Sequence, residues 1–317
     1  MRFLRTPRYN TLLARGDMSY QGKLMLGTSP PRKENHLDVF NLGGEVNVNI
    51  FKVEDHLLAI GELPYGMEFD PITLASRPGK DGPHGGFFHF NDSLSELGVG
   101  CAHPIELPAS AATGAGVSQA GDLISKTSTI PMAALGARTD YKIFRIPRGT
   151  SKREVLATFS RVEAAITYAH AFALPSPRYA VLPFWPLTIA KAAVLAGNNL
   201  HDGMRWKPEE GTKFTVMDLE TGQATTFALN ETVFGFHFAN AFVRRIITPA
   251  AGAAGEAGAA GARGGGEQSS EGTEGDTAQL EIVADMITTS SAIFNSLMVD
   301  SFRNGSAIDH SELISES

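Results

Sequence analysis

The chain of 317 residues contains a single cysteine, Cys101, so it can form neither an internal disulfide nor a zinc site built from several cysteines. No run approaches the 18 or so apolar residues that a membrane-spanning helix needs. The first ten residues, MRFLRTPRYN, lack the apolar core of a secretory signal, so we expect an intracellular protein of the cytoplasm or a plastid. Without further cysteines, the nine histidines are the obvious candidates for binding a transition metal.

Positive charge is also scarce, because 27 Lys and Arg face 34 Asp and Glu, giving a net charge of −7. No cluster of basic residues stands out, which argues against nucleic acid as a partner. The apolar share of 43% is typical of a globular chain. The 19 phenylalanines suit a core, an apolar ligand or peripheral contact with a membrane equally well.

Short alternating segments separated by turn residues dominate the chain, at a spacing of roughly ten residues, which is typical of a β-sandwich or propeller. Residues 151–162 fit either a strand or a short helix. Residues 168–187 predict a hairpin with His170 on its first arm. Other strands are predicted at 46–53, 56–61, 141–146, 213–219 and 224–229, and from Leu280 onward.

Composition changes abruptly at residues 249–278, which are almost entirely Ala, Gly, Glu and Ser. Such a segment cannot bury enough apolar surface to offset the entropy of ordering it. We therefore expect one domain over residues 1–317 that carries a disordered insert at 249–278.

One apolar stretch, FGFHFANAF at 234–242, carries a histidine. As a strand it would place Phe234, Phe236 and Phe238 on one face and His237 on the other, among the small residues Gly235 and Ala239. Two interpretations are open. His237 is either a buried histidine bonded to a carbonyl group or a ligand with room in front of its ring.

Other histidines also have small or rigid neighbours. His103 precedes Pro104, which restricts its backbone to extended geometry, and His170 lies between two alanines. His103 could equally be an ordinary histidine at a loop edge. His84 and His89 lie in a glycine-rich loop, which would pre-organise a metal pair poorly.

Six stretches, taken together and in order, resemble the carotenoid cleavage oxygenase family, which comprises non-haem iron enzymes and includes the isomerohydrolase of the retinal pigment epithelium. The resemblance runs through almost the whole chain. The stretches are RFLRTPRYNTLLARG with GKLMLGT, NVNIFKVEDHLLAIGELPYGMEFDPITLAS, AHP at 102–104, HAFALPSPRYAVLPFWPL, FHFANAF and LEIVADMITTSSAIFNSLMVDSFRN.

This resemblance implies a seven-bladed β-propeller with Fe(2+) on its axis, held by four histidines, of which His103, His170 and His237 would be three. Glu62 would be a carboxylate that accepts the N–H of a ligand imidazole, which we expect to be that of His170. The implied reaction is the addition of O2 across a double bond of a carotenoid or apocarotenoid, which gives two carbonyl products.

The chain departs from the family pattern at Ile105 and Phe238, where a further histidine is usual, and at Val243, where an acidic residue is usual. We expect an incomplete propeller, because the stretches that carry the first blades and the fourth histidine are not found. His310 follows the third motif too closely to be that ligand.

Alternatives therefore stay open. They are a non-catalytic fragment or carotenoid- or retinoid-binding relative, isomerohydrolase activity on a retinyl ester, and an unrelated β protein with three core histidines. A shared metal requires the ring nitrogens of the three histidines to approach within about 3 to 4 Å of one another.

Overall fold

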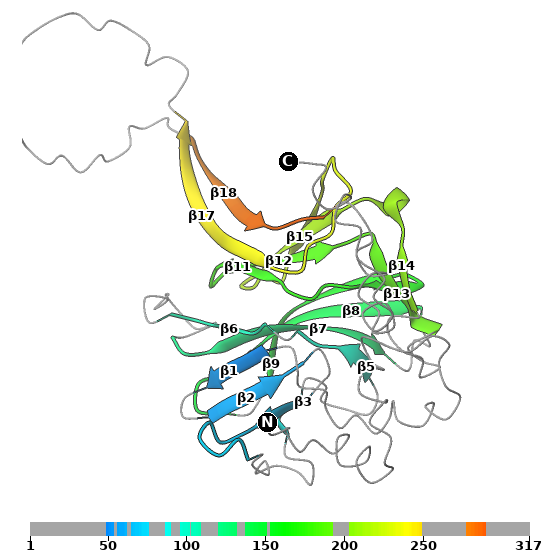
Figure 1. The fold of residues 1–317 in the computed structure, drawn as a ribbon. Coiled ribbons are helices and arrows are strands. Elements are labelled where there is room, and N and C mark those ends of the chain that lie inside the picture. The colour runs from blue at the N-terminus through cyan, green and yellow to red at the C-terminus, as the bar shows by residue number, and fades with distance from the viewer. Residues whose placement is uncertain are drawn as a thin grey trace, which may run out of the picture.

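A computed structural model describes eleven stretches of the chain, and strands make up most of them, with almost no helix (Figure 1). The all-β prediction is therefore confirmed. No helix in these stretches is both long and apolar enough to cross a membrane. The described residues are 49–53, 56–61, 65–75, 86–89, 96–101, 103–108, 120–131, 137–150, 153–192, 203–248 and 277–289.

The strands in these stretches form five antiparallel sheets (Figure 1). The first sheet has the order β1-β2-β3-β4, with bounds Asn49–Val53, His56–Ile60, Tyr65–Glu68 and Gly86–His89. The second has the order β5-β7-β8-β9, with bounds Glu96–Val99, Leu123–Pro131, Arg138–Ile146 and Glu154–Val162, and β6 (Ile105–Glu106) also pairs with β7.

The remaining sheets have three, four and two strands. The order β10-β13-β14 joins Ala165–Thr167, Leu187–Ala190 and Met204–Trp206. The order β11-β12-β15-β16 joins Ala173–Ser176, Tyr179–Phe184, Lys213–Asp218 and Ala224–Ala228, and the short 3-10 helix η5 (Pro208–Glu210) precedes β15. A two-stranded ribbon pairs β17 (Phe238–Thr248) with β18 (Thr277–Met286). Small antiparallel sheets placed in succession are the blades of a propeller, and this fold is an incomplete one.

Local sequence explains several of these elements. The hairpin of β15 and β16 turns at Gly222, whose φ of 73° suits glycine. The Asp218 carboxylate accepts the N–H groups of Glu220 and Thr221 at 2.9 and 3.2 Å, which closes the turn. Residues 154–162, for which a strand and a helix were both open, form β9.

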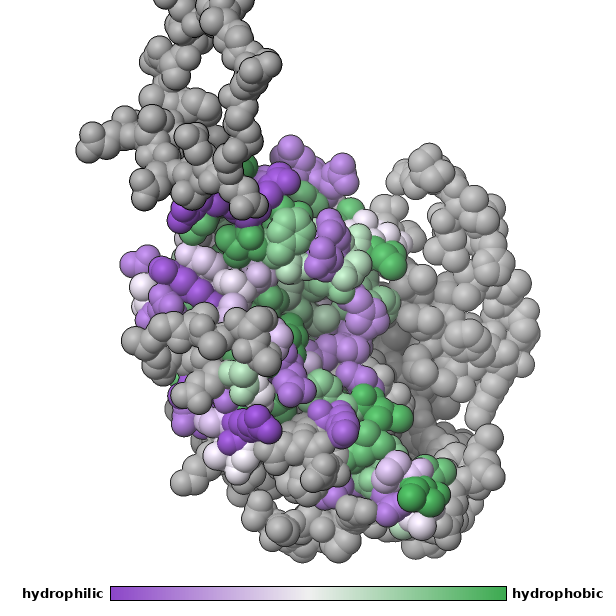
Figure 2. All heavy atoms as spheres, turned by 90° about the vertical axis from the view of Figure 1, so that its left-hand side faces the viewer, coloured by the Kyte–Doolittle hydropathy of each residue, from purple (hydrophilic) through white to green (hydrophobic). Residues whose placement is uncertain are grey.

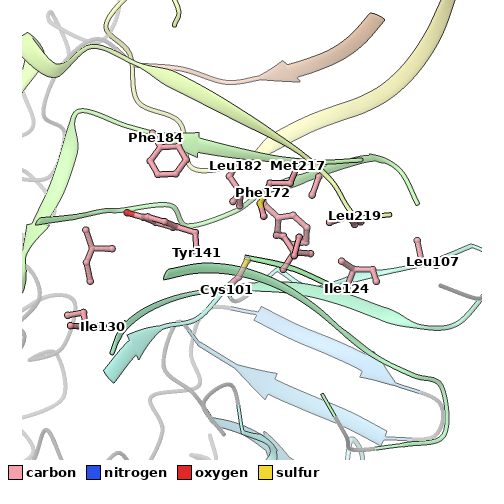
Figure 3. Close-up of a cluster of buried hydrophobic side chains, with 14 residues drawn as sticks. Cys101, Leu107, Ile124, Ile130, Tyr141, Phe172, Leu182, Phe184, Met217 and Leu219 are labelled. Carbon is pink, nitrogen blue, oxygen red and sulfur yellow. The ribbon is translucent and has the colours of Figure 1, made fainter. Parts of the chain in front are cut away.

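The main core lies between the second sheet and the sheet of β11, β12, β15 and β16 (Figure 3). Tyr141 and Cys101 from one side meet Phe172, Leu182 and Met217 from the other. Cys101 is fully buried there. This packing joins two successive sheets and fixes the chain just before His103.

A second core cluster holds the chain that leads to His237. Phe234 is fully buried and stacks on Tyr168 with 6.2 Å between ring centroids and 13° between ring planes. It also meets the rings of Trp185 and Phe236 edge-on. Aromatic pairs of this kind add about 0.5–1.5 kcal/mol to the free energy of burial. The segment before His237 is thus anchored by packing.

The predicted strand at 234–242 is wrong in its first half, because β17 begins only at Phe238. Phe234 forms an isolated bridge with Thr289, in which each backbone N–H donates to the other residue's carbonyl at 2.8 Å. A Cβ atom at Gly235 would lie 2.9 Å from the carbonyl oxygen of Ile287. The small size of Gly235 therefore serves this close approach.

Two other boundaries differ from the expectation. His170 does not lie on the first arm of its hairpin, because β11 begins at Ala173 and the hydrogen-bonded register starts there. Thr277 and Ala278, which the sequence assigned to the predicted insert, belong to β18, where they pair with Thr248 and Ile247. Residues 249–276 lie outside the described stretches.

The ribbon of β17 and β18 extends away from the sheets in Figure 1. Apolar side chains are exposed along it, namely Phe242, Ile246 and Leu280. Figure 2 looks onto the side toward which the ribbon projects, and its upper half shows apolar patches beside polar ones. The ribbon thus combines exposed apolar residues with charged ones such as the pair Arg244 and Glu281.

We predict that Phe234→Ala lowers the free energy of unfolding by about 3–5 kcal/mol, because it empties a fully buried site between Tyr168 and Trp185. Phe227→Ala is the matched control, because that ring is 56% exposed, and it should cost less than about 1 kcal/mol. Urea unfolding followed by tryptophan fluorescence measures both. Equal losses in the two variants would contradict the anchoring role of Phe234.

Candidate metal centre

Three histidines come together from segments that lead into three different sheets, and none of the three lies within a strand. His103 lies two residues before β6, His170 three residues before β11 and His237 directly before β17. The irregular backbone before a strand is free of ladder pairing, so it can turn a side chain toward a shared point. The three histidines that the sequence singled out are those that the fold brings together.

The ring nitrogens of these histidines converge on one point. Nε2 of His103 lies 2.9 Å from Nε2 of His170 and 3.2 Å from Nε2 of His237. The rings of His170 and His237 stand nearly edge to face, with 5.0 Å between centroids. One ligand atom from each residue lies within 4.8 Å of the other two.

These separations fit ligation of a single metal ion. Two nitrogens at about 2.1 Å from one ion and at right angles to each other lie about 3.0 Å apart. The observed 2.9 and 3.2 Å are close to that value. Imidazole is a ligand for Zn, Cu, Fe and Ni, so the group can hold a transition metal.

Burial and mutual proximity keep at least two of the rings neutral. The pKa of His103 is lowered to about 4, mainly by burial and secondarily by the nearby charges of His170 and His237. Burial, and secondarily the charge of His170, also lowers the pKa of His237. A neutral imidazole has one unprotonated nitrogen, which is what a metal ligand requires.

Exposure differs across the cluster. The whole of His170 is only 6% exposed, His103 is half-buried and His237 is exposed. The edge of the Phe236 ring packs against His170, with 5.4 Å between centroids and 89° between planes. One ligand is therefore enclosed by aromatic rings, while the opposite side of the cluster faces solvent.

The hydroxyl group of Tyr168 lies 3.4 Å from Nδ1 of His170 and is a contact that the sequence had not suggested. The sequence placed both residues on the predicted first arm of one hairpin, where residues i and i+2 point to the same side, so their proximity could have been predicted. Glu62, the predicted acceptor for the His170 N–H, lies outside the described residues. Its role stays a prediction.

Cys101 links two of the histidine segments through its thiol group. The backbone N–H of His103 donates to Sγ at 3.4 Å, and Sγ donates to the backbone carbonyl of His170 at 3.3 Å. The sequence had singled out Cys101 only for being alone. Its partner lies 69 residues away, so no local pattern could have shown this bridge.

Asn49, the first residue of β1, was also missed. Its side-chain Nδ2 lies 3.5 Å from Nδ1 of His103, on the far side of the ring from the cluster. His84 and His310 lie outside the described residues, and only the backbone of His89 belongs to them, as the last residue of β4. The interpretation of those three histidines therefore stays as the sequence left it.

A family model described as retinal pigment epithelial membrane protein matches residues 1–311. The chain belongs to this family, the carotenoid cleavage oxygenases. No curated protein sequence matches the chain.

Solved structures of carotenoid cleavage oxygenases share the fold. A mutant of the Synechocystis apocarotenoid oxygenase is 18% identical, with a TM-score of 0.53, over 91% of this chain and 57% of that one. The cobalt-substituted Synechocystis enzyme is 19% identical, with a TM-score of 0.53, over 90% and 57%. A chimera of that oxygenase and RPE65 is 21% identical, with a TM-score of 0.52, over 78% and 47%. The chain thus spans about half the length of these relatives.

We predict that the metal-free protein loses stability as the pH falls from about 6.5 to about 4. In that window His103 is neutral when folded but protonated when unfolded, so the unfolded state binds the additional proton. The melting temperature at pH 7.5 and pH 4.5 measures the loss. His103→Gln should show a smaller drop than the wild type, because carboxylates contribute equally to both. An equal drop in both would contradict the lowered pKa.

We further predict that Cys101→Val weakens Co(II) binding by about fivefold, because it removes two weak sulfur hydrogen bonds worth about 1 kcal/mol in total. Cys101→Ser keeps a donor and an acceptor at the same place and should stay within about twofold of the wild type. Titration followed by visible absorption measures both. A serine variant as weak as the valine variant would show that packing alone explains the effect.

Proposed function

We propose that His103, His170 and His237 hold Fe(2+), and that the protein cleaves a double bond of a carotenoid or apocarotenoid with O2 to give two carbonyl products. The observation that carries this proposal is the approach of three Nε2 atoms to 2.9 and 3.2 Å in a chain of this family. The names of the relatives with known structures support apocarotenoids as a substrate class.

The donor set suits this chemistry. Bound iron(II) would supply the redox chemistry by which O2 reacts with a polyene. Three neutral imidazoles would not neutralise the charge of the metal, and they would leave coordination positions open for other ligands. The described residues that form the group include no carboxylate.

The surrounding residues hold and shield the ligands. The Tyr168 hydroxyl group lies at Nδ1 of His170, and Phe236 covers one side of the same ring. These groups keep water from the buried ligand and limit its rotation. The anchored Phe234 and the close packing at Gly235 fix the backbone from which His237 extends. The protein thus positions each ligand by packing that does not involve the metal.

A second candidate function is binding of a carotenoid or retinoid without catalysis. It is favoured by one observation, that the group in the described stretches contains three histidines while the family resemblance implies four. Contact with a membrane surface, where such substrates dissolve, stays a prediction for either function.

Anaerobic reconstitution with Fe(2+) separates the two functions. We expect one iron per chain in the wild type and, after O2 is admitted with an apocarotenal, two carbonyl products detected by liquid chromatography. His237→Ala removes a ligand on the exposed side, so it should weaken iron binding at least about 100-fold while the fold persists. His310→Ala is the matched control and should bind iron like the wild type.

The outcomes point in different directions. An absence of stoichiometric iron together with retained polyene binding would favour the non-catalytic function. Full iron loading without carbonyl products would contradict the proposed cleavage but not the metal centre. Equal iron affinity in His237→Ala and the wild type would contradict the assignment of His237 as a ligand.

A further inference from the structure

The side chain of Asn49 reaches the candidate metal centre from a sheet that contributes no histidine to it. Asn49 is half-buried and begins β1, and its backbone pairs with Ile60, a buried residue of β2. Its amide group lies 3.5 Å from Nδ1 of His103. His103 belongs to the segment before β6, which pairs with the second sheet. The contact therefore joins two sheets across 54 residues of sequence.

The proton on the His103 ring decides what this contact does. Nε2 of His103 points at the other two histidines, so a metal there requires Nε2 to be unprotonated. The ring proton must then reside on Nδ1, where it needs an acceptor. An amide side chain offers an oxygen or an NH2 group at the same place, depending on a half-turn about its last torsion.

We propose that Asn49 is a positioning residue for His103, whose side-chain oxygen accepts the Nδ1–H group when Nε2 binds the metal. This proposal rests on the proposed function. Without metal, the Asn49 NH2 group donates to Nδ1, and the Nε2–H group of His103 donates to Nε2 of His170 at 2.9 Å. The amide thus matches either tautomer of the ring.

A neutral acceptor differs from a carboxylate in its effect on the metal. A carboxylate behind an imidazole raises the basicity of the ligand and adds a negative charge, whereas an amide orients the ring without adding charge. Asn49 would therefore fix the tautomer and direction of His103 while leaving the charge of the site unchanged.

Asn49→Leu and Asn49→Asp test this role, with Co(II) as the metal probe. The leucine variant cannot accept a hydrogen bond from the Nδ1–H group of His103, so we expect its Co(II) affinity to fall by about 10–100-fold, with altered visible absorption bands. The aspartate variant can only accept, so its affinity should lie within about threefold of the wild type or exceed it. Asn230→Leu is the matched control for the substitution itself, because the side chain of Asn230 is exposed.

A second readout needs no metal. Long-range nitrogen-15 NMR of the imidazole rings reports which nitrogen of His103 carries the proton. We expect the Nδ1–H form to predominate in Asn49→Asp and to be less populated in Asn49→Leu. Melting temperatures of Asn49→Leu and Asn230→Leu show whether any loss of affinity comes from unfolding.

The results separate the inference from the proposed function. Unchanged Co(II) affinity and identical tautomer populations in both Asn49 variants would overturn the inference while leaving the metal centre in place. Equal loss in the leucine and aspartate variants would also overturn it, because a merely structural role would not be rescued by an acceptor. A wild type that binds no Co(II) would contradict the proposed metal centre, and the tautomer measurement would still decide the contact between Asn49 and His103.

Discussion

The close approach of three imidazole rings is the constraint on which the rest of the structure depends. Nitrogens at 2.9 and 3.2 Å cannot all be protonated, because like charges at that distance repel strongly in a partly buried place. Burial is the larger cause of the lowered pKa values of His103 and His237, and the neighbouring imidazole rings lower them further. The fold must therefore supply the free energy that holds the three rings together, and it does so with the aromatic and aliphatic packing behind each segment.

That packing explains why the site depends on the succession of sheets. His103 is positioned by the core between the second sheet and the sheet of β11, and His237 by the cluster around Phe234. The Cys101 thiol joins the backbones of His103 and His170 directly. Each of the three histidines is thus supported by contacts between elements that lie far apart in the chain, so the geometry of the cluster depends on the assembly of several sheets.

Much of the architecture could be predicted from the sequence, for reasons that are local. The strands predicted at 56–61 and 141–146 correspond to β2 and to the second part of β8, and those predicted at 213–219 and 224–229 form the hairpin of β15 and β16. The three histidines were found through their motifs, and the structure brings them together, while their role as ligands stays a proposal. Glu62 lies outside the described residues, so its role also stays a prediction.

What the sequence missed depends on long-range contacts. Alternation at 234–242 suggested a continuous strand, but the bridge from Phe234 to Thr289 and the close approach at Gly235 override it. The contacts of Asn49 and Cys101 span 54 and 69 residues, so no periodicity reveals them. Tyr168 is different, because a spacing of two residues from His170 on one predicted strand would place both side chains on the same face, so their proximity could have been predicted.

The graded exposure of the three histidines has a consequence for the proposed metal site. His170 is enclosed, His103 is half-buried and His237 faces solvent, so the cluster has one open side. An ion bound there would arrive from water by way of His237 and would lose its hydration shell stepwise as it moved inward to His103 and His170. A chelator would approach from the same open side, so the ion would leave in the reverse order and lose its contact with His237 last.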